Sequence, residues 1–259
     1  MTTSTMAVPR GAAADYVELV KPRITLMVML TALVGFVMGS RGGVDFPALV
    51  AALAGTGLVA AGASTLNMLL ERRTDALMHR TRNRPLPTGR LRPAEALAWG
   101  AVLTAAGLAF LAWRSGPLPA LVALVTWTSY LFLYTPLKTR TSLATVVGAL
   151  PGALPPVIGW TAARGSIDPG AFVLFAILFL WQIPHFLAIA WIYREDYARG
   201  GLPMLPVVDP AGIVTGRQAV ANALALTIVS LAPAFGGMAG DVYLAGALAL
   251  GVMFTASAV

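Results

Sequence analysis

Residues 47–70 read PALVAALAGTGLVAAGASTLNMLL, and residues 71–93 continue as ERRTDALMHRTRNRPLPTGRLRP. The first stretch carries no charged residue. It is long enough for a helix to cross the roughly 30 Å of hydrocarbon in a bilayer. The second stretch is rich in arginine and contains prolines that break a helix. Together they predict a transmembrane helix that runs directly into a basic loop at one face of the membrane.

The composition of the whole chain agrees with a membrane protein. Its residues are 58% hydrophobic and 11% charged, with a mean hydropathy of +0.77, whereas soluble domains carry about 25% charged residues. The absence of cysteine excludes disulfides and cysteine nucleophiles, and two histidines make a zinc site unfavourable. The net charge of +7 comes from basic residues between apolar runs, which favours a membrane explanation over nucleic-acid binding. Residues 1–10 lack the apolar centre of a signal peptide.

Apolar runs of similar length recur on both sides of residues 47–70. We therefore predict an all-α, polytopic transmembrane helical bundle of about eight helices, with a cytoplasmic segment at 1–23 and one transmembrane domain at 24–259. The chain stops at Val259 within an apolar run, which suggests a truncated sequence or a last helix that ends abruptly. The predicted spans are 24–40, 47–70, 95–113, 117–135, 143–162, 171–193, 218–236 and 242–259.

The basic residues predict the orientation of the bundle. Alternate connecting segments hold fifteen lysines and arginines, and the opposite segments hold three. The excess of positive charge marks the cytoplasmic side, so the N-terminus and the long loops are expected there. The fifteen are Arg10, Lys21, Arg23, Arg72, Arg73, Arg80, Arg82, Arg84, Arg90, Arg92, Lys138, Arg140, Arg194, Arg199 and Arg217, and the three are Arg41, Arg114 and Arg164.

A polar stripe marks the end of the second predicted span. Asn67, Glu71 and Asp75 are four residues apart and share one helix face, each about 6 Å beyond the last. Such oxygen ligands suit Mg²⁺, which keeps part of its coordination shell for substrate phosphates. The alternative is a solvated helix end whose acids pair with the arginines beside them. His79 extends the spacing but could equally be a surface histidine beyond the end of the helix.

A second polar cluster follows the sixth predicted span. Glu195, Asp196 and Tyr197 precede Arg199, and the charge bias places them on the same face of the membrane as the first stripe. Two facing carboxylate sets can hold a pyrophosphate between bridging Mg²⁺ ions. The alternative is a capped helix end followed by a loop. Lys138, at the end of the fourth span, is a third group on that face that could contact a phosphate or serve as an interfacial anchor.

Two spans contain residues that are unusual at membrane depth. Gln182, Pro184 and His185 lie within the sixth span, where polar groups are expected to face a cavity or a neighbouring helix. His185 could be a heme ligand, a proton donor or a structural hydrogen-bonding group. In the fifth span, TSLATVVGALPGALPPVIGW (141–160), the prolines predict a kinked segment packed closely against its neighbours.

The motifs together resemble the heme O synthase (protoheme IX farnesyltransferase) family of UbiA-type intramembrane prenyltransferases. The resemblance runs from KPR at 21–23 to DYARGGLPMLP at 196–206. Its most specific parts are NMLLERRTDALMHRTRNRPLP, YTPLK, GALPGALPPVIGW and WQIPHF. At the second motif the chain departs from the superfamily, because widely spaced aspartates are replaced by the adjacent Glu195 and Asp196. Family members usually continue through a further helix, so a full-length chain would have nine.

The resemblance implies a bundle around a membrane cavity that joins farnesyl diphosphate to a vinyl group of heme B. Water completes the reaction, which gives heme O and pyrophosphate. It also implies a bacterial inner membrane location, an active site open to the cytoplasm, contact with membrane lipid, and a heme A synthase or terminal oxidase assembly factors as partners. The implied catalytic residues are Asn67, Glu71, Asp75, Asp196 and Tyr197; Mg²⁺ would be bound by Asn67, Glu71, Asp75 and Asp196, and the substrates by Arg23, Arg82, Arg84, Lys138, Arg199 and His185.

Two other functions remain open at this point. The prenyl acceptor could be an aromatic acid or a quinone precursor, and only the resemblance favours heme. A transporter with a broken helix in the proline-rich span is a different class. Transporters bind substrate near the bilayer midplane and contain internal repeats, whereas the polar residues here gather at one face and no clear repeat is present. The sequence therefore favours an enzyme.

Overall fold

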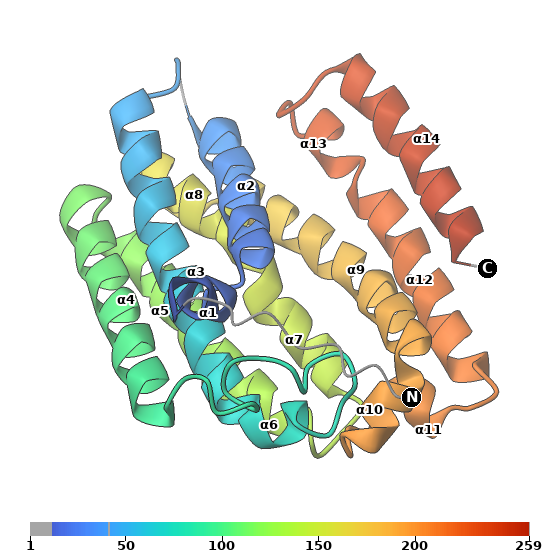
Figure 1. Cartoon of the computed structure of the whole chain (residues 1–259). Helices are drawn as coiled ribbons and strands as arrows, with labels where there is room; N and C mark the ends of the chain where they lie inside the picture. The colour runs from blue at the N-terminus through green and yellow to red at the C-terminus, as the bar shows by residue number, and fades with distance from the viewer. Residues whose placement is uncertain (1–11, 41, 259) are drawn as a thin grey trace.

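A computed structural model describes residues 12–40 and 42–258, and every regular element in these two ranges is a helix (Figure 1). Large apolar side chains cover the outside, among them Val102, Phe172 and Ile228, which are more than half exposed. A soluble protein rarely exposes so much apolar surface. The chain is an all-α, multi-pass membrane bundle, as predicted.

Seven helical segments within the described residues are long and apolar enough to cross a membrane. An eighth apolar helix, α14, has 17 residues and is therefore shorter than the other spans. The seven segments and α14 thus correspond to the eight predicted spans within the described residues. Val259, the last residue of the eighth predicted span, lies outside these residues. The seven segments are Pro22–Gly39, Phe46–Asp75, Pro93–Arg114, Pro117–Leu137, Ala144–Arg164, Pro169–Ile192 and Ile213–Phe235.

Several of these spans are composite. The helices that build them, with the short connecting ones, are α1 (Ala12–Leu19), α2 (Pro22–Gly39), α3 (Phe46–Asp75), α4 (Pro93–Arg114), α5 (Pro117–Thr128), the π-helix η1 (Ser129–Tyr134), α6 (Thr135–Leu137), α7 (Ala144–Ala153), α8 (Pro155–Arg164), α9 (Pro169–Ile192), α10 (Arg194–Arg199), α11 (Leu205–Val208), α12 (Ile213–Val229), α13 (Ala232–Phe235) and α14 (Asp241–Ser257).

The proline-rich fifth span is kinked, as predicted. It consists of α7 and α8, which meet at Leu154. Pro155 opens α8, where its missing N–H and fixed φ fit the first turn of a helix. Beside it, Gln182 on α9 is buried and its amide nitrogen donates to the Leu178 carbonyl at 3.0 Å. The prediction that this amide faces a neighbouring helix is confirmed, because its oxygen packs against Gly152 of α7.

Glycines allow the closest helix packing. Gly62 of α3 and Gly100 of α4 leave no room for a β carbon. A β carbon on Gly62 would overlap Thr104 of α4, and one on Gly100 would overlap the Leu66 side chain of α3. The same holds between α2 and α8, where a β carbon on Gly159 would overlap the Ala32 carbonyl oxygen. In a membrane, where lipid is as apolar as leucine, such close packing stabilises helix pairs. Figure 1 shows α3 beside α4, and α2 crossing α8.

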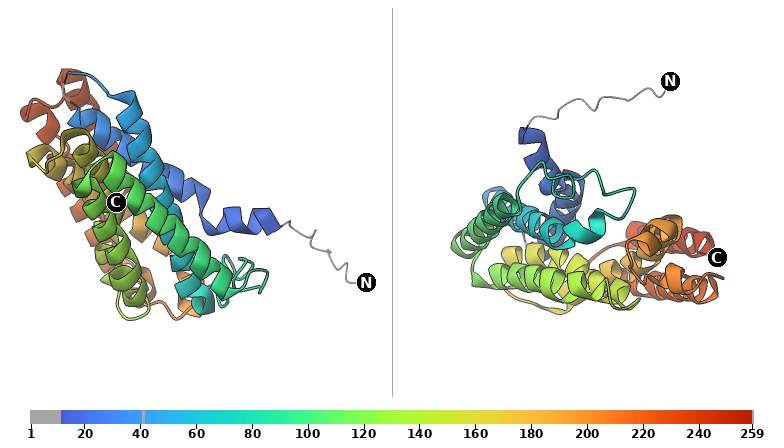
Figure 2. Two further views of the ribbon diagram at one scale, coloured as in Figure 1. Left: turned by 90° about the vertical axis from the view of Figure 1, so that its left-hand side faces the viewer. Right: turned by 60° about the horizontal axis from the view of Figure 1, so that its bottom comes forward.

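Three short helices and the long connection between α3 and α4 gather at one end of the bundle, whereas the short helix α13 lies at the other end. Figure 1 shows α6, α10 and α11 at the first of these ends, together with the connection between α3 and α4. The first helix, α1, turns away from the direction of α2 (Figure 2). It is held by an ion pair, in which Arg90 Nε lies 3.0 Å from Asp15 Oδ1. This end therefore carries most of the charged side chains that the sequence placed on one face.

Candidate active site

The polar stripe lies at the last turns of α3. Asn67 and Asp75 are each 1% exposed although they are polar, and Glu71 lies between them. All three belong to one unbroken helix, so the prediction that they share a face is confirmed. The helix ends at Asp75, and His79 follows in a turn with an exposed side chain. His79 therefore does not belong to the helix face that Asn67, Glu71 and Asp75 share.

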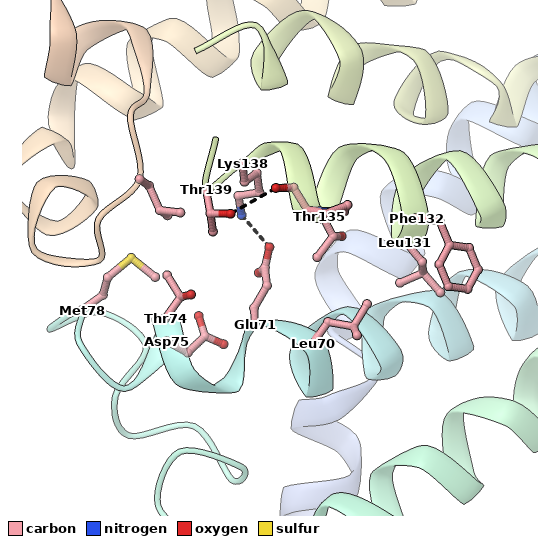
Figure 3. A pocket seen from close by; sticks show the side chains of 12 residues that line it. Leu70, Glu71, Thr74, Asp75, Met78, Leu131, Phe132, Thr135, Lys138 and Thr139 are labelled. Carbon is pink, nitrogen blue, oxygen red and sulfur yellow. Dashed lines mark hydrogen bonds and ion pairs between the residues drawn. The ribbon is translucent and has the colours of Figure 1, made fainter. Parts of the chain in front are cut away.

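A cavity of about 360 Å³ opens beside Glu71 and Asp75, whereas Asn67 is buried one turn before them and does not line it. Figure 3 shows Glu71, Thr74 and Asp75 on one side and Thr135, Lys138 and Thr139 on the other. Apolar side chains form the rest of its lining. The lining residues are Leu70, Glu71, Thr74, Asp75, Met78, Leu131, Phe132, Thr135, Pro136, Lys138, Thr139 and Leu202. The cavity is thus polar at the last turn of α3 and apolar on both sides of that turn.

Three cations contact the stripe. The Lys138 Nζ donates to Glu71 Oε1 at 2.8 Å, and the Arg84 Nη1 donates to Asp75 Oδ2 at 2.8 Å. The Lys21 Nζ donates to Asn67 Oδ1, also at 2.8 Å. The described residues of the site therefore include two acid–cation pairs and a third cation that is bound to an amide. A site of this kind can receive an anion, because the lysines and the arginine can exchange their present oxygen partners for phosphate oxygens.

Lys21 is a site residue that the sequence analysis missed. Within the described chain it is the one non-glycine residue with positive φ, at 46°, and this left-handed turn joins α1 to α2. Non-glycine residues adopt this conformation at a cost and often do so at functional sites. Burial lowers the pKa of its ammonium to about 8, while Glu71 acts in the opposite direction. The predicted neighbour Arg23 is instead exposed.

The stripe fits a divalent cation. The Asp75 Oδ1 is buried and has no hydrogen-bond partner among the residues that the structure describes, which is costly unless a ligand binds it. No group of three or more histidines, cysteines or acids close enough to hold a metal occurs in the described ranges. A cation here would thus rely on Glu71, Asp75, the Asn67 carbonyl oxygen and oxygens of a ligand. This is the incomplete protein shell typical of Mg²⁺.

Asp196 joins the two polar loops. Its two carboxylate oxygens accept backbone N–H groups of His79 and Arg80, each at 3.0 Å, and the Arg199 Nη2 donates to it at 2.9 Å. The Arg80 N–H, followed by the other two donors, lowers the pKa of this carboxyl. The stabilisation exists at neutral pH and is lost as the pH falls through the lowered value. Asp196 as a metal ligand stays a prediction, with three donors already on its oxygens.

The other predicted site residues occupy different surroundings. Tyr197 packs with Met78 and Leu202, which both line the cavity. Arg82 is exposed, and Arg199 pairs with Asp196. His185 stacks on Trp181 of its own helix with ring centroids 4.8 Å apart, and it is absent from the lining of the cavity. The structure thus brings together Asn67, Glu71, Asp75, Arg84 and Lys138, whereas the roles of the others stay predictions.

We expect Asp196→Asn to loosen the connection between α3 and α4. Both carboxylate oxygens of Asp196 accept a backbone N–H, whereas the side chain of asparagine has one oxygen and one NH₂ group. The NH₂ group would face a backbone N–H, so one of the two contacts becomes repulsive. Tryptic cleavage after Arg80 or Arg82 should accelerate about five- to tenfold, because this segment opens locally more often. Limited proteolysis of the purified protein followed by peptide mass spectrometry measures this rate.

The control is Glu195→Gln, which neutralises the adjacent exposed acid and should leave the cleavage rate unchanged. Equal cleavage rates in Asp196→Asn and the unmodified protein would contradict a structural role for this carboxylate. If activity lost in Asp196→Asn returned at higher Mg²⁺ without any change in cleavage, Asp196 would act as a metal ligand instead.

Comparison with known proteins gives consistent matches along the chain. The profile of the UbiA prenyltransferase family matches residues 28–259. A protoheme IX farnesyltransferase of Solibacter usitatus is 50% identical over 254 residues, which cover 95% of this chain and 87% of the relative. A protoheme IX farnesyltransferase of Myxococcus xanthus is 46% identical and covers 93% of this chain and 82% of the relative.

Solved structures share the fold at lower identity. A digeranylgeranylglyceryl phosphate synthase superposes with a TM-score of 0.79 at 17% identity, covering 95% of this chain and 86% of the other. A UbiA homologue from Archaeoglobus fulgidus bound to GPP and Mg²⁺ superposes with a TM-score of 0.74 at 21% identity, covering 93% of this chain and 86% of the other. At these identities the likeness concerns the fold alone.

Proposed function

The chain belongs to the UbiA prenyltransferase family, and we propose that it transfers the farnesyl group of farnesyl diphosphate to a vinyl group of heme B. The vinyl carbon bonds to farnesyl C1 as the C1–O bond breaks and pyrophosphate leaves. Water then adds to the resulting cation and loses a proton, which gives the hydroxyethylfarnesyl side chain of heme O. The sequence relatives that cover nearly the whole chain carry the name of this activity.

The observation that carries the proposal is the cavity at the end of α3. Its polar part is lined by Glu71, Asp75 and Lys138, and Arg84 pairs with Asp75 beside it, which suits a diphosphate. Its walls include Leu131 and Phe132, which suit a prenyl chain. A substrate with an anionic head and an isoprenoid tail matches both parts, with the head at the membrane surface and the tail among the helices.

The chain's own residues contribute binding and charge stabilisation. Lys21, Arg84 and Lys138 can turn from their present partners to the diphosphate oxygens, where positive charge stabilises the departing pyrophosphate. The apolar wall excludes water while the allylic cation exists, which prevents its premature hydrolysis. Between turnovers, Asp75 and Glu71 hold Arg84 and Lys138 in place, and the side-chain amide of Asn67 holds Lys21.

We include Mg²⁺ in this proposal. The relative from Archaeoglobus fulgidus is described with this ion, and the unpartnered Asp75 Oδ1 offers a ligand atom for it. Asn67, Glu71 and Asp75 would hold the ion. When bound, it neutralises part of the diphosphate charge and so makes pyrophosphate a better leaving group.

The finer location and the partners are also part of the proposal. The excess of lysine and arginine at the site end of the bundle supports a cytoplasmic active site in a bacterial inner membrane. Residues 1–23 then form a cytoplasmic segment before a single transmembrane domain at 24–259. Heme O formed within the membrane would pass to a heme A synthase or to terminal oxidase assembly.

A product assay tests the function. Purified protein in lipid nanodiscs, given Mg²⁺, heme B and farnesyl diphosphate, should form a hydroxyethylfarnesyl heme that mass spectrometry identifies. Omission of Mg²⁺ with a chelator present should reduce its formation strongly. Prenylation of a phenolic acid in place of heme would instead assign the enzyme to a different acceptor.

A further inference from the structure

Asn67 is held at both ends of its side-chain amide. Its Nδ2 donates to the Thr135 Oγ1 at 3.1 Å, and its Oδ1 accepts from the Lys21 Nζ at 2.8 Å. Asn67 is 1% exposed and Thr135 is 7% exposed, so water competes little for these contacts. Thr135 belongs to α6, on the far side of the cavity from α3 (Figure 3). The amide therefore spans from one wall of the site toward the other.

The chemistry of the partners fixes which end of the amide is which. A lysine ammonium has donors and no acceptor, so the atom that faces Lys21 must be the Asn67 oxygen. A threonine hydroxyl has one proton, and the Thr135 Oγ1 donates it to the Tyr130 carbonyl at 2.8 Å. The hydroxyl oxygen can then only accept from Asn67, so the amide nitrogen must face it. Two independent partners thus require the same orientation.

The Thr135 hydroxyl donates its proton to the Tyr130 carbonyl, which belongs to the π-helix η1. The backbone N–H of Thr135 also bonds to the Tyr130 carbonyl, five residues back, as in a π-helical turn. One carbonyl oxygen therefore receives both the N–H and the hydroxyl of Thr135. Short π-helical segments are rare and frequently lie at functional sites. Here the segment directs the hydroxyl of Thr135 toward Asn67 as an acceptor.

We infer that Thr135 is a positioning residue that orients the Asn67 amide so that its carbonyl oxygen is presented to a divalent cation. The inference rests on the proposed function, because it takes Asn67 as one of the metal-binding residues. Without the Thr135 oxygen, the amide N–H has no acceptor on α6, and Lys21 alone holds the orientation of the amide. Once Lys21 turns to the diphosphate, the amide is free to rotate. Its nitrogen, which cannot bind a cation, then occupies the ligand position in part of the molecules.

The test replaces the Thr135 hydroxyl by a methyl group, which nearly preserves the shape of the side chain. Thr135→Val should raise the Mg²⁺ concentration for half-maximal activity by about ten- to a hundredfold, the usual effect of removing a group that orients a metal ligand. Thr135→Ser keeps the oxygen and should stay within about threefold of the unmodified protein. A second readout needs no turnover and no heme: Mn²⁺ binding in the presence of inorganic pyrophosphate, followed by electron paramagnetic resonance, should weaken by a similar factor in Thr135→Val.

The matched control is Thr65→Val. Thr65 is fully buried on α3, two residues before Asn67, and its hydroxyl donates to the Ala61 carbonyl of the same helix at 2.9 Å. Its replacement should change neither Mn²⁺ binding nor Mg²⁺ activation. If Thr135→Val fails to fold, Thr135→Ala removes the hydroxyl without adding a methyl group against the Tyr130 carbonyl.

The outcomes separate this inference from the proposed function. Mn²⁺ binding by Thr135→Val or Thr135→Ala equal to that of the unmodified protein overturns the inference. The inference is also overturned if Thr135→Val and Thr135→Ala both unfold while Thr135→Ser stays folded, because the hydroxyl would then be needed for folding. Normal binding of Mn²⁺ by the unmodified protein with no heme product would refute the heme acceptor and leave the positioning role intact.

Discussion

Replacing Asp75 by asparagine should lower kcat by about a hundred- to a thousandfold, the usual loss when a group that stabilises transition-state charge is removed. One of its carboxylate oxygens is bound to Arg84 at 2.8 Å, and the other is buried without a partner in the described part of the chain. Asparagine preserves the shape and removes the charge that holds a cation beside the leaving group. Single-turnover formation of the prenylated heme in nanodiscs measures the effect.

The chain contains a close chemical match for this substitution. Asp168 has one oxygen 2.9 Å from Arg164, and its other oxygen is also buried without a partner among the described residues. It lies at the start of α9, away from the cavity. Asp168→Asn should therefore keep kcat within about threefold, since the same charge is removed far from the diphosphate. Near-normal turnover in a folded Asp75→Asn protein would remove this carboxylate from the chemistry.

The second large effect concerns the fold. A β carbon on Gly159 of α8 would overlap the Ala32 carbonyl oxygen and would lie 2.7 Å from the Phe36 backbone nitrogen. Backbone atoms cannot rotate aside as a side-chain tip can, so α2 and α8 must separate. We expect Gly159→Ala to destabilise the protein by about 3 kcal/mol or more, at the upper end of the cost of overpacking. Thermal unfolding in mild detergent, followed by circular dichroism, gives the change.

Gly246→Ala is the control for the loss of glycine itself. Gly246 lies in α14, and a β carbon there meets no heavy atom within 4 Å. Alanine is favoured over glycine within a helix by up to about 1 kcal/mol, so this variant should be as stable as the unmodified protein or more stable. A melting temperature for Gly159→Ala as high as that of Gly246→Ala would show that the two helices yield easily.

Periodic features of the bundle could be predicted from sequence. Hydrophobic length set the positions of the spans, and the four-residue spacing placed Asn67, Glu71 and Asp75 on one face because helical geometry depends on sequence separation alone. His79 departs from this pattern since the helix ends before it. The composite nature of the fourth span was not predictable, because a π-helical turn depends on the packing around it as much as on local composition.

The partners of the stripe needed the structure. Lys21 and Arg23 are both basic and nearly adjacent, and only the left-handed backbone of Lys21 decides which one reaches Asn67. Asp196 was expected to face the first acidic set, whereas its oxygens accept backbone N–H groups of residues 79 and 80. Backbone donors have no signal in a sequence, because every residue except proline carries one.

The links to Asn67 also set an order for biogenesis. The lysine that reaches it precedes it by 46 residues, and the threonine follows it by 68. Chains are synthesised from the N-terminus at about 5–20 residues per second, so α3 is available several seconds before its partner on α6. During that interval Glu71 lacks Lys138, and an ionisable group near the end of an apolar span is costly without a partner. Glu71 therefore gains this partner only when the fourth span docks against α3.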